Sequence, residues 1–205
     1  DLHPVAHSLP TRRSSDLVPE EVLLEGIGIK KETFYNREVV RNDVLTITDR
    51  YSDEGYAYAD ISPLIDRNDA DMTVDIRYNI DKGPLVHFEK IVITGNTKTR
   101  DKVIRRELKV YEQELYSGRA LKRGVRNLYR LDYFEDVKVD TRKGSTDDSM
   151  VLIVDVKEKP TGAFSFGGGY SSVEEVFILG SISQKNLFGR GQILELKGTL
   201  GGKSN

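Results

Sequence analysis

The chain has two stretches in which apolar residues recur at spacings of three and four, which predicts a helix with one buried face in each. Asn36 precedes the first stretch and Ser117 the second, and both residue types are favoured N-caps. Shorter helices are predicted upstream, at residues 19–27 and 100–108. The apolar positions are Val40, Val44, Ile47 and Tyr51 in the first stretch, and Leu121, Val125, Leu128 and Leu131 in the second.

After each pair of helices, apolar residues occur at every second position, the period of a strand with one buried face. A further β-rich run, residues 86–93, precedes the helices of the second copy and ends at the turn signal Thr94-Gly95-Asn96. The repeating unit is therefore β-α-α-β-β, and the predicted fold class is α+β with tandem domains. The strands after the helices are predicted at residues 56–61 and 74–80 in the first copy, and at 134–139 and 150–156 in the second.

Residues 7–17, HSLPTRRSSDL, occupy the place where the first copy should have its leading strand. This basic, Ser-rich stretch has no strand pattern. A common sequencing-adapter DNA translates to the same residues except at Leu9, so we expect residues 1–17 to be a non-native segment. The first domain, residues 18–83, is then expected to lack its first strand, whereas the second domain, residues 84–159, is complete.

From residue 160 onward the helix signals end and glycine becomes frequent. Three alternating runs, at residues 163–170, 176–182 and 194–200, are apolar on one face and polar or small on the other. Such alternation is typical of transmembrane β-barrel strands. Residues 160–205 are therefore predicted to be the first three strands of an outer-membrane barrel, truncated at the end of the chain; an ordinary water-facing sheet is the alternative.

The composition of the chain argues against several classes of function and structure. The 205 residues carry a formal net charge of −2, which gives no argument for nucleic-acid binding. The sequence has no cysteine, which excludes disulfides and thiolate zinc sites within it. No apolar run is long enough for a membrane-spanning helix. With 38% hydrophobic and 31% charged residues, the chain is not disordered by composition.

Two stretches resemble a nucleotide-binding or metal-binding motif, but each lacks part of that motif. Residues 198–204 have three residues between two glycines where a P-loop needs four, and no helix follows. Residues 66–71 lack the glycine and glutamate of a calcium loop. His87 has no partner cluster, which favours a strand surface. We therefore expect no catalytic residue, no cofactor, no metal, and a protein that is not an enzyme.

Several short motifs occur in a fixed order along the chain. Residues 49–57 (DRYSDEGYA), 93–96 (ITGN) and 105–108 (RREL) resemble motifs of POTRA domains. Residues 159–162 (KPTG) and 186–191 (NLFGRG) resemble the start of the β-barrel that follows such domains. In this order, the motifs resemble the BamA-type family of outer-membrane protein assembly factors. The resemblance covers residues 18–205, and it implies the last two POTRA domains joined to the first barrel strands, with residues 186–191 as a periplasmic turn.

The resemblance implies two kinds of site. Exposed POTRA edge strands would receive clients by β-augmentation, and a weakly paired first barrel strand would open as a seam. Charge at Lys138, Asp140 and Arg142 could instead merely protect the second edge, and the glycines of the seam could simply fit a crowded bend. The implied edge residues are Tyr56, Ala57, Tyr58, Ala59, Phe134, Val137 and Val139, and the implied seam residues are Phe164, Phe166, Gly167, Gly168, Gly169 and Tyr170.

By the same resemblance, the function is assembly and insertion of β-barrel proteins into the bacterial outer membrane, with the POTRA domains in the periplasm. The implied partners are unfolded outer-membrane proteins, accessory assembly lipoproteins and outer-membrane lipid, without nucleic acid. Two alternatives stay open: a protein-translocating transporter of the same superfamily, such as a two-partner secretion transporter, and a soluble POTRA scaffold protein.

Overall fold

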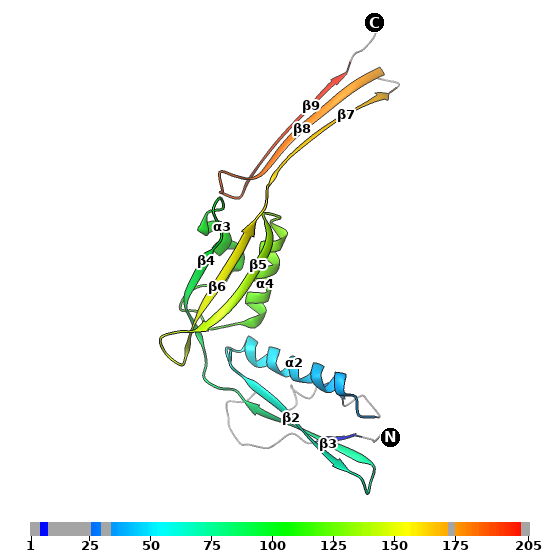
Figure 1. Cartoon of the computed structure of the whole chain (residues 1–205), viewed down its shortest axis with the longest axis vertical. Coiled ribbons are helices and arrows are strands. Elements are labelled where there is room, and N and C mark those ends of the chain that lie inside the picture. Colours follow the sequence, from blue (N-terminus) through cyan, green and yellow to red (C-terminus); the bar gives the residue numbers. More distant parts are fainter. Residues whose placement is uncertain (1–4, 8–25, 30–33, 172–174, 202–205) are drawn as a thin grey trace. The chain divides into compact units, whose positions relative to one another are not determined.

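The computed structural model describes residues 5–7, 26–29, 34–171 and 175–201. These residues form three sheets of three strands each, and helices flank two of the sheets (Figure 1). The chain divides into two compact units. The first contains Asp1–Glu89, Glu112–Ala120 and Lys143–Met150, and the second contains Lys90–Tyr111, Leu121–Arg142 and Val151–Asn205.

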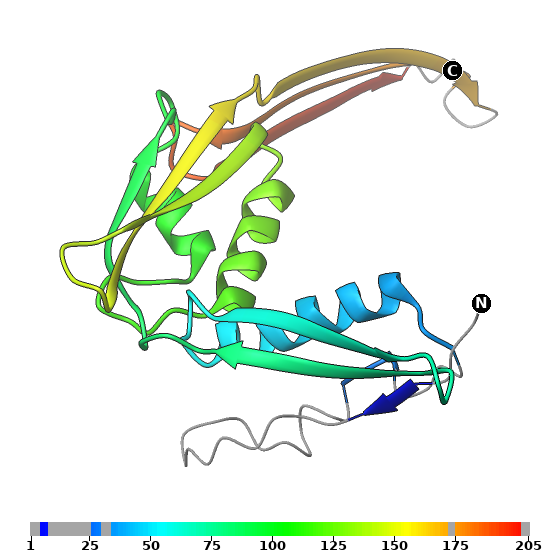
Figure 2. The same cartoon turned by 60° about the horizontal axis from the view of Figure 1, so that its bottom comes forward.

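The first domain is a sheet with helix α2 (Arg37–Asp53) along one face (Figure 2). The strand order is β1-β3-β2, and β3 (Thr73–Asp81) is antiparallel to β2 (Asp60–Asn68). The Asn36 side chain accepts hydrogen bonds from two backbone N–H groups of the first turn of α2, which makes it the predicted N-cap. The capped helix and the alternation in β3 are therefore confirmed.

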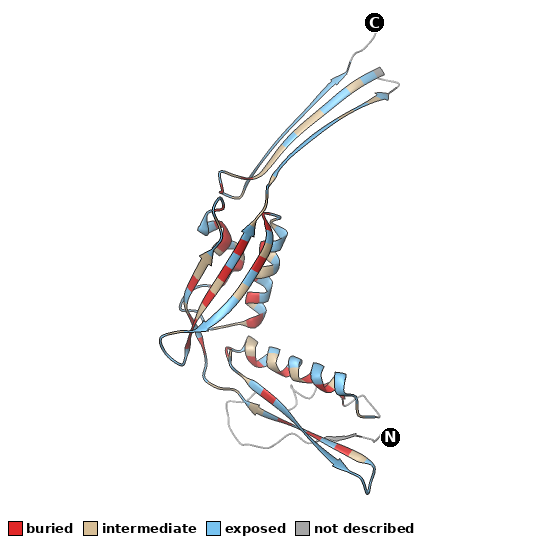
Figure 3. Cartoon of the chain, viewed as in Figure 1, coloured by how far each residue is buried: buried red, intermediate tan, exposed pale blue. Residues whose placement is uncertain are grey.

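The core of the first domain forms where the apolar face of α2 meets the inward face of β3. Helical spacing on one side and strand alternation on the other bring large side chains together, and Figure 3 shows these positions as buried. The buried members of this core are Ile27, Ile29, Val40, Ile47, Tyr51, Ile61, Val74, Ile76 and Tyr78.

A carboxyl group, Asp43, lies within the apolar face of α2 and is only 2% exposed. Its oxygens accept hydrogen bonds from the N–H groups of Gly28 (2.6 Å) and Ile29 (3.1 Å) and from the Tyr78 hydroxyl (3.2 Å). Burial raises the pKa of Tyr78, and the neighbouring Asp43 raises it further, so the phenol stays protonated and donates. Asp43 is tolerated in the core because donors surround it.

A short strand that the sequence pattern does not predict, β1 (Val5–His7), pairs in parallel with β3. Val5 lies opposite Val74, and His7 lies opposite Ile76. β1 thus takes the place beside β3 that β4 takes beside β6 in the second domain. The structure differs here from the expected absence of a first strand. The physical reason is that pairing uses backbone groups, which three residues can supply whatever their side chains.

Part of the opening segment lies outside the described residues. This applies to residues 8–25, which include most of HSLPTRRSSDL and most of the helix predicted at residues 19–27. The non-native origin of residues 1–17 and the domain boundaries therefore stay predictions.

The second domain has the same order of elements. Its sheet has the order β4-β6-β5, formed by β4 (His87–Thr94), β6 (Ser149–Glu158) and β5 (Phe134–Lys143). Helices α3 (Asp101–Leu108) and α4 (Gly118–Arg130) lie on one face of this sheet (Figure 2). The predicted β-α-α-β-β order is confirmed. No helix within the described ranges is both long and apolar enough to cross a membrane.

A glycine and an asparagine bring α3 and α4 close together. A Cβ at Gly124 would clash with the backbone of Leu108, so α4 can approach the end of α3 only without a side chain there. The Asn127 side chain donates a hydrogen bond to the carbonyl oxygen of Glu107 (3.1 Å). This bond satisfies one of the acceptors that have no partner within the last turn of a helix.

The third sheet consists of β7 (Gly162–Ser171), β8 (Glu175–Leu187) and β9 (Gln192–Gly201), paired antiparallel in that order. These strands confirm the three runs predicted after residue 160. Across the sheet, Phe164 lies opposite Ile182, which itself lies opposite Leu196. The register therefore brings the apolar residues of the three strands onto one face.

The two faces of this sheet differ in polarity. The face opposite Phe164 carries polar contacts: the Ser165 and Ser181 hydroxyl oxygens are hydrogen-bonded at 2.6 Å, and Lys197 forms an ion pair with Glu195 (2.9 Å). Figure 3 shows most of β7 to β9 as exposed or intermediate. The apolar face includes Phe164, Phe166, Ile182, Leu196 and Leu200, which are 56–78% exposed.

We expect Leu128→Ala in α4 to lower the free energy of unfolding by about 2–5 kcal/mol, because the side chain is fully buried and its removal leaves a cavity. Urea denaturation followed by circular dichroism measures the loss. Leu45→Ala, at a helix position that is 54% exposed, is the control and should change stability by less than about 0.5 kcal/mol. Equal stability of the two variants would contradict the assignment of Leu128 to the core.

Candidate functional site

The first predicted edge residues form a turn and are not part of a strand. Helix α2 is followed by Gly55, whose φ of 106° suits a glycine, and the Tyr56 N–H then bonds back to the carbonyl oxygen of Tyr51 (3.1 Å). The bonds that end the helix thus use backbone groups of this segment, and β2 begins only at Asp60. The prediction of an edge strand was therefore wrong for Tyr56, Ala57, Tyr58 and Ala59.

Among the described residues, the edge of the first domain is β2 itself, which has a neighbouring strand, β3, on one side only. Leu64 and Ile65 on this strand are 55% and 47% exposed. Pro63 and Ile65 line a groove of about 830 Å³ together with Val40 and Val44 of α2. Pro63 has no N–H, so a strand added to β2 would lack one hydrogen bond at this position.

The edge of the second domain is β5, as predicted, with β6 on its inner side. Phe134 and Val137 are 4% and 6% exposed and belong to the core, and Val139 is partly buried. A partner bound at this edge would therefore not contact these side chains directly. An added segment would meet the backbone of β5, and the role of this strand in binding clients stays a prediction.

The turn between β8 and β9 is bound to the loop before α3 through polar groups that are nearly buried. The Asn186 side chain, 8% exposed, donates a hydrogen bond to the hydroxyl of Thr99 (2.7 Å), which is 3% exposed. Its carbonyl oxygen accepts from the Gly191 N–H (2.9 Å). The Arg100 N–H donates to the carbonyl oxygen of Gly189 (3.0 Å). The sequence predicts a turn at these positions but not this contact.

The backbone of this turn depends on glycine. Gly189 has a φ of 69°, and a Cβ there would also clash with the carbonyl oxygen of Lys98. Glycine is thus required both for the left-handed conformation and for the close approach of the two chain segments. Asn186 has a φ of 57°, a value that asparagine adopts more readily than most residues.

Glu158, at the end of β6, shapes the same loop from its other side. Its carboxylate accepts hydrogen bonds from the N–H groups of Lys98 (2.8 Å) and Thr99 (2.6 Å) and from the Thr97 hydroxyl (2.8 Å). Burial raises the pKa of Glu158, but the hydrogen bonds, those of Thr99 first, lower it more, so the pKa lies below its ordinary value. The charged carboxylate holds Thr99 in position for Asn186.

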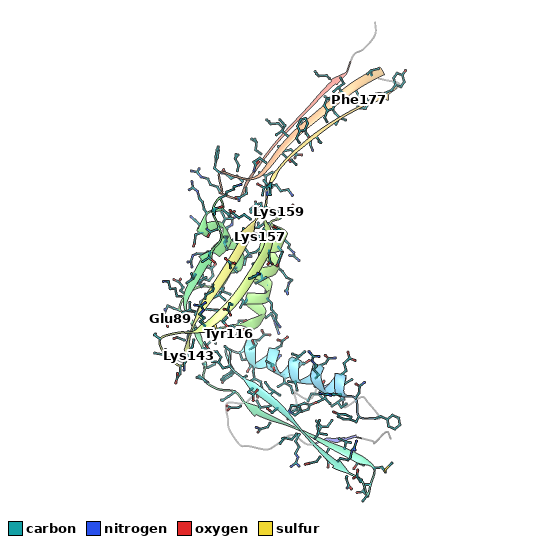
Figure 4. All side chains as sticks on the ribbon, in the orientation of Figure 1. Glu89, Tyr116, Lys143, Lys157, Lys159 and Phe177 are labelled. Atoms are coloured by element: carbon teal, nitrogen blue, oxygen red, sulfur yellow. The ribbon has the colours of Figure 1, made fainter. Side chains whose placement is uncertain are left out.

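Asp132, in the turn before β5, joins two further segments at this junction. Its carboxylate accepts from the ammonium groups of Lys159 (2.5 Å) and Lys185 (2.9 Å), and Figure 4 shows Lys159 where β6 passes toward β7. The hydrogen bond from Lys159, followed by that from Lys185, lowers the pKa of Asp132 to about 2. Because these groups are largely exposed, water and salt screen the pair, which orients the segments more than it stabilises them.

The predicted seam residues all lie on β7, which has a neighbour, β8, on one side only within the described residues. Gly169 lies opposite Phe177, and Gly167 lies opposite Leu179. A Cβ at Gly169 would come within 2.7 Å of the Phe177 ring, which Figure 4 labels on β8. The glycines have no left-handed φ values. Gly169 leaves room for the Phe177 ring, whereas a Cβ at Gly167 would make only ordinary contact with Leu179.

The residues that resemble metal or nucleotide sites serve structural roles where the structure describes them. His87 is exposed on β4, and its N–H donates to the carbonyl oxygen of Asp148 (2.9 Å). In the hairpin loop after β2, the Asn68 side chain donates to Asp71 (2.8 Å). Among the described residues, no group of three or more His, Asp or Glu side chains is arranged to hold a metal ion.

Comparison with known proteins identifies the repeated domain. The model of the POTRA family, described as surface antigen variable number repeat, matches residues 14–83 and 86–159. The chain belongs to the POTRA family. The two matched segments correspond to the two helix-backed sheets, so the predicted tandem of POTRA domains is confirmed.

The relatives extend the likeness into the third sheet. Over 176 residues, the chain is 32% identical to the outer membrane protein assembly factor BamA of Nitratidesulfovibrio vulgaris, which covers 86% of this chain and 22% of that protein. The crystal structure of BamA from Haemophilus ducreyi lacking POTRA domains 1–3 matches with a TM-score of 0.81 and 26% identity, over 98% of this chain and 37% of that one. CdiB from Escherichia coli, with 14% identity and a TM-score of 0.51 over 97% of this chain and 36% of that one, shares the fold.

These matches confirm a POTRA tandem followed by barrel strands, because the H. ducreyi structure covers β7 to β9 as well as both domains. The chain spans about a fifth of the length of the curated BamA relatives it matches.

We expect Asn186→Ala to loosen the turn between β8 and β9, because the Thr99 hydroxyl and the Gly191 N–H would lose their partner in a nearly buried place. The free energy of local opening should fall by about 1–3 kcal/mol, measured by hydrogen exchange of the Arg100 and Gly191 amides. Asn79→Ala, at an exposed position on β3, is the matched control. Unchanged exchange in Asn186→Ala would contradict the role given to this network.

The lowered pKa of Asp132 predicts a pH dependence at the junction. A carboxyl whose pKa is lowered by folding contributes stability above its ordinary pKa of 3.8, and this contribution is lost as the pH falls toward the folded value of about 2. Replacing Lys159 and Lys185 by Gln should move the pKa of Asp132 up toward about 4, measured by NMR titration of the carboxyl carbon. A titration midpoint that does not move would show that the two ammonium groups do not hold Asp132.

Proposed function

We propose that this chain is part of a β-barrel insertase of the bacterial outer membrane. In this function, the POTRA domains receive unfolded outer-membrane proteins in the periplasm and pass them to the barrel, whose first strand templates their insertion. The process needs no catalytic residue and no cofactor, because it consists of backbone pairing and the transfer of apolar surface from water to lipid. Accessory assembly lipoproteins are further partners of the POTRA domains.

The observation that carries the proposal is the two-faced sheet that directly follows the second POTRA domain. β7 and β9 have 10 residues each, which is the length of a tilted strand that crosses a bilayer. Most of the large apolar side chains of the three strands lie on one face and are exposed, whereas polar and small residues share the other face with Phe177, Leu179 and Ile193. Lipid covers such an apolar face, and water fills the polar interior of a barrel.

Reception of clients is supported by the edges of the two POTRA sheets. β2 and β5 each have a neighbouring strand on one side, so their outer backbone groups face away from the sheet. An extended segment pairs with such an edge mainly through backbone hydrogen bonds, so clients of different sequence can bind. Beside β2, the groove lined by Ile65 and Val44 offers apolar contacts for alternate side chains of a client.

Transfer from the POTRA domain to the barrel is supported by the junction. The Asn186–Thr99 and Arg100–Gly189 hydrogen bonds fix the turn between β8 and β9 to the loop before α3. These hydrogen bonds connect the second POTRA domain to the first barrel strands. A client that binds the edge of the second domain would be passed to the barrel across this connection.

A disulfide across the seam tests this function directly. In the full-length gene product, Ala163→Cys on β7 is combined with a cysteine on the facing last strand of the barrel. Closing the seam leaves no free strand to template a client, so oxidation should block the appearance of newly folded barrels in the outer membrane, and a reductant should restore it. Folded barrels are measured by their resistance to unfolding in cold detergent on gels.

The control is Ala163→Cys alone, which should assemble barrels as the unmodified protein does under both conditions. Undiminished assembly with the seam fully oxidised would contradict the templating step. Loss of a secreted protein from the medium, with barrel assembly intact, would instead favour a secretion transporter. A gene product that fractionates without the membrane would favour a POTRA scaffold.

A further inference from the structure

Hydrogen-bonding groups on the outer edge of β5 are already engaged by side chains. In a strand, the N–H and C=O of one residue point in the same direction. The Tyr129 hydroxyl meets both groups of Val137: it accepts from the N–H (3.2 Å) and lies in donating position to the carbonyl oxygen (3.3 Å). Because β6 lies on the other side of β5, Val137 presents its backbone outward, where an added strand would bind.

Tyr129 reaches this edge from α4, close to the end of the helix. Its hydroxyl also lies in donating position to the carboxylate of Asp136 (3.1 Å), and this carboxylate accepts from the Val137 N–H (2.9 Å). The three residues thus form a small closed set of hydrogen bonds. Tyr129 is 46% exposed, so its ring can swing into water without opening the core.

A similar bond occurs four residues farther along the edge. The Thr141 N–H donates to the carboxylate of Asp140 (2.9 Å). Since backbone direction alternates along a strand, residues 137, 139 and 141 direct their N–H and C=O groups to the same side. Val139 is therefore the outward residue between two residues whose N–H groups are bound to the preceding aspartate.

The strand also changes its alternation beside Tyr129. Phe134 and Val137 are both buried although they are three residues apart, so the inward face shifts by one position between them. Such a shift is typical of a β-bulge, which is a common protection of an edge strand. The shift in alternation and the tyrosine occur at the same place, which indicates that this part of the edge is built to resist pairing.

We propose that Tyr129 is a removable cover on the β5 edge, and that an extended segment pairs with β5 only by displacing the Tyr129 hydroxyl from Val137. The occupant is an unfolded, extended segment, because it brings an N–H and a C=O that replace the two bonds lost at Val137. Pairing then exchanges hydrogen bonds without adding any at this residue, so the complex is weak and easily released. Weak pairing suits transient clients and prevents edge-to-edge association of two copies.

This inference rests on the proposed function, in which POTRA edges receive unfolded chains. The test uses the full-length gene product in lipid nanodiscs, with Tyr129→Phe as the variant, because it removes the hydroxyl and keeps the ring. Tyr58→Phe, at a tyrosine of similar exposure (43%) in the turn before β2, is the control. The probe is a fluorescent peptide with the sequence of residues 192–201, QILELKGTLG, a barrel-type strand.

Two measurements test separately whether Tyr129 covers the β5 edge and whether this edge binds an extended peptide. Hydrogen exchange of residues 134–141 should become faster in Tyr129→Phe and stay unchanged in Tyr58→Phe. The peptide should bind Tyr129→Phe about 2- to 10-fold more tightly, the effect expected for one net hydrogen bond, and should protect these same amides.

Unchanged exchange in Tyr129→Phe, or equal peptide affinity of all three proteins at β5, would overturn the cover. A peptide that leaves the β5 amides of every variant unprotected would instead overturn β5 as a receiving edge. In that case, the exchange of residues 134–141 still decides whether Tyr129 closes the edge.

Discussion

The hydrogen bond between Asn186 and Thr99 joins two parts of the molecule that suit different solvents. On one side is a helix-backed POTRA domain whose apolar residues are inside. On the other is a β-hairpin whose apolar residues face outward. The covalent connection at Pro160 and Thr161 would by itself leave their orientation free. A donor and an acceptor that are both nearly buried restrict it, because each costs free energy when it is left without a partner.

The rest of the junction serves this contact. Glu158 binds the loop that presents Thr99, and glycine at position 189 allows the turn to approach that loop. The Asp132 carboxylate adds a screened, salt-sensitive restraint through Lys159 and Lys185. The buried hydrogen bonds thus hold the turn between β8 and β9 against the loop before α3, and the exposed ion pairs add a weaker restraint. In the proposed function, a receiving edge on the POTRA domain would act on the barrel seam through this contact.

The periodic parts of the fold could be predicted from the sequence, whereas the contacts of the site could not. Helix and strand periods identify α2, α4, β3 and β6 because each buries one regular face. The segment at Tyr56 also alternates, but the bonds that end α2 take its backbone groups. Asn186 and Thr99 are 87 positions apart, and no local pattern links them. The buried carboxyl of Asp43 could have been recognised from the sequence, since an acidic residue three positions after Val40 interrupts an apolar helix face.

The Asn186–Thr99 bond holds the barrel hairpin to the POTRA domain. A double-mutant cycle with Thr99→Val and Asn186→Ala, read from the free energy of local opening at the Arg100 amide, measures that bond directly. We expect the double variant to lose less stability than the sum of the single variants, with a coupling of about 1 kcal/mol or more. Additive losses within about 0.3–0.5 kcal/mol would contradict the claim, because they would show that the two side chains act independently.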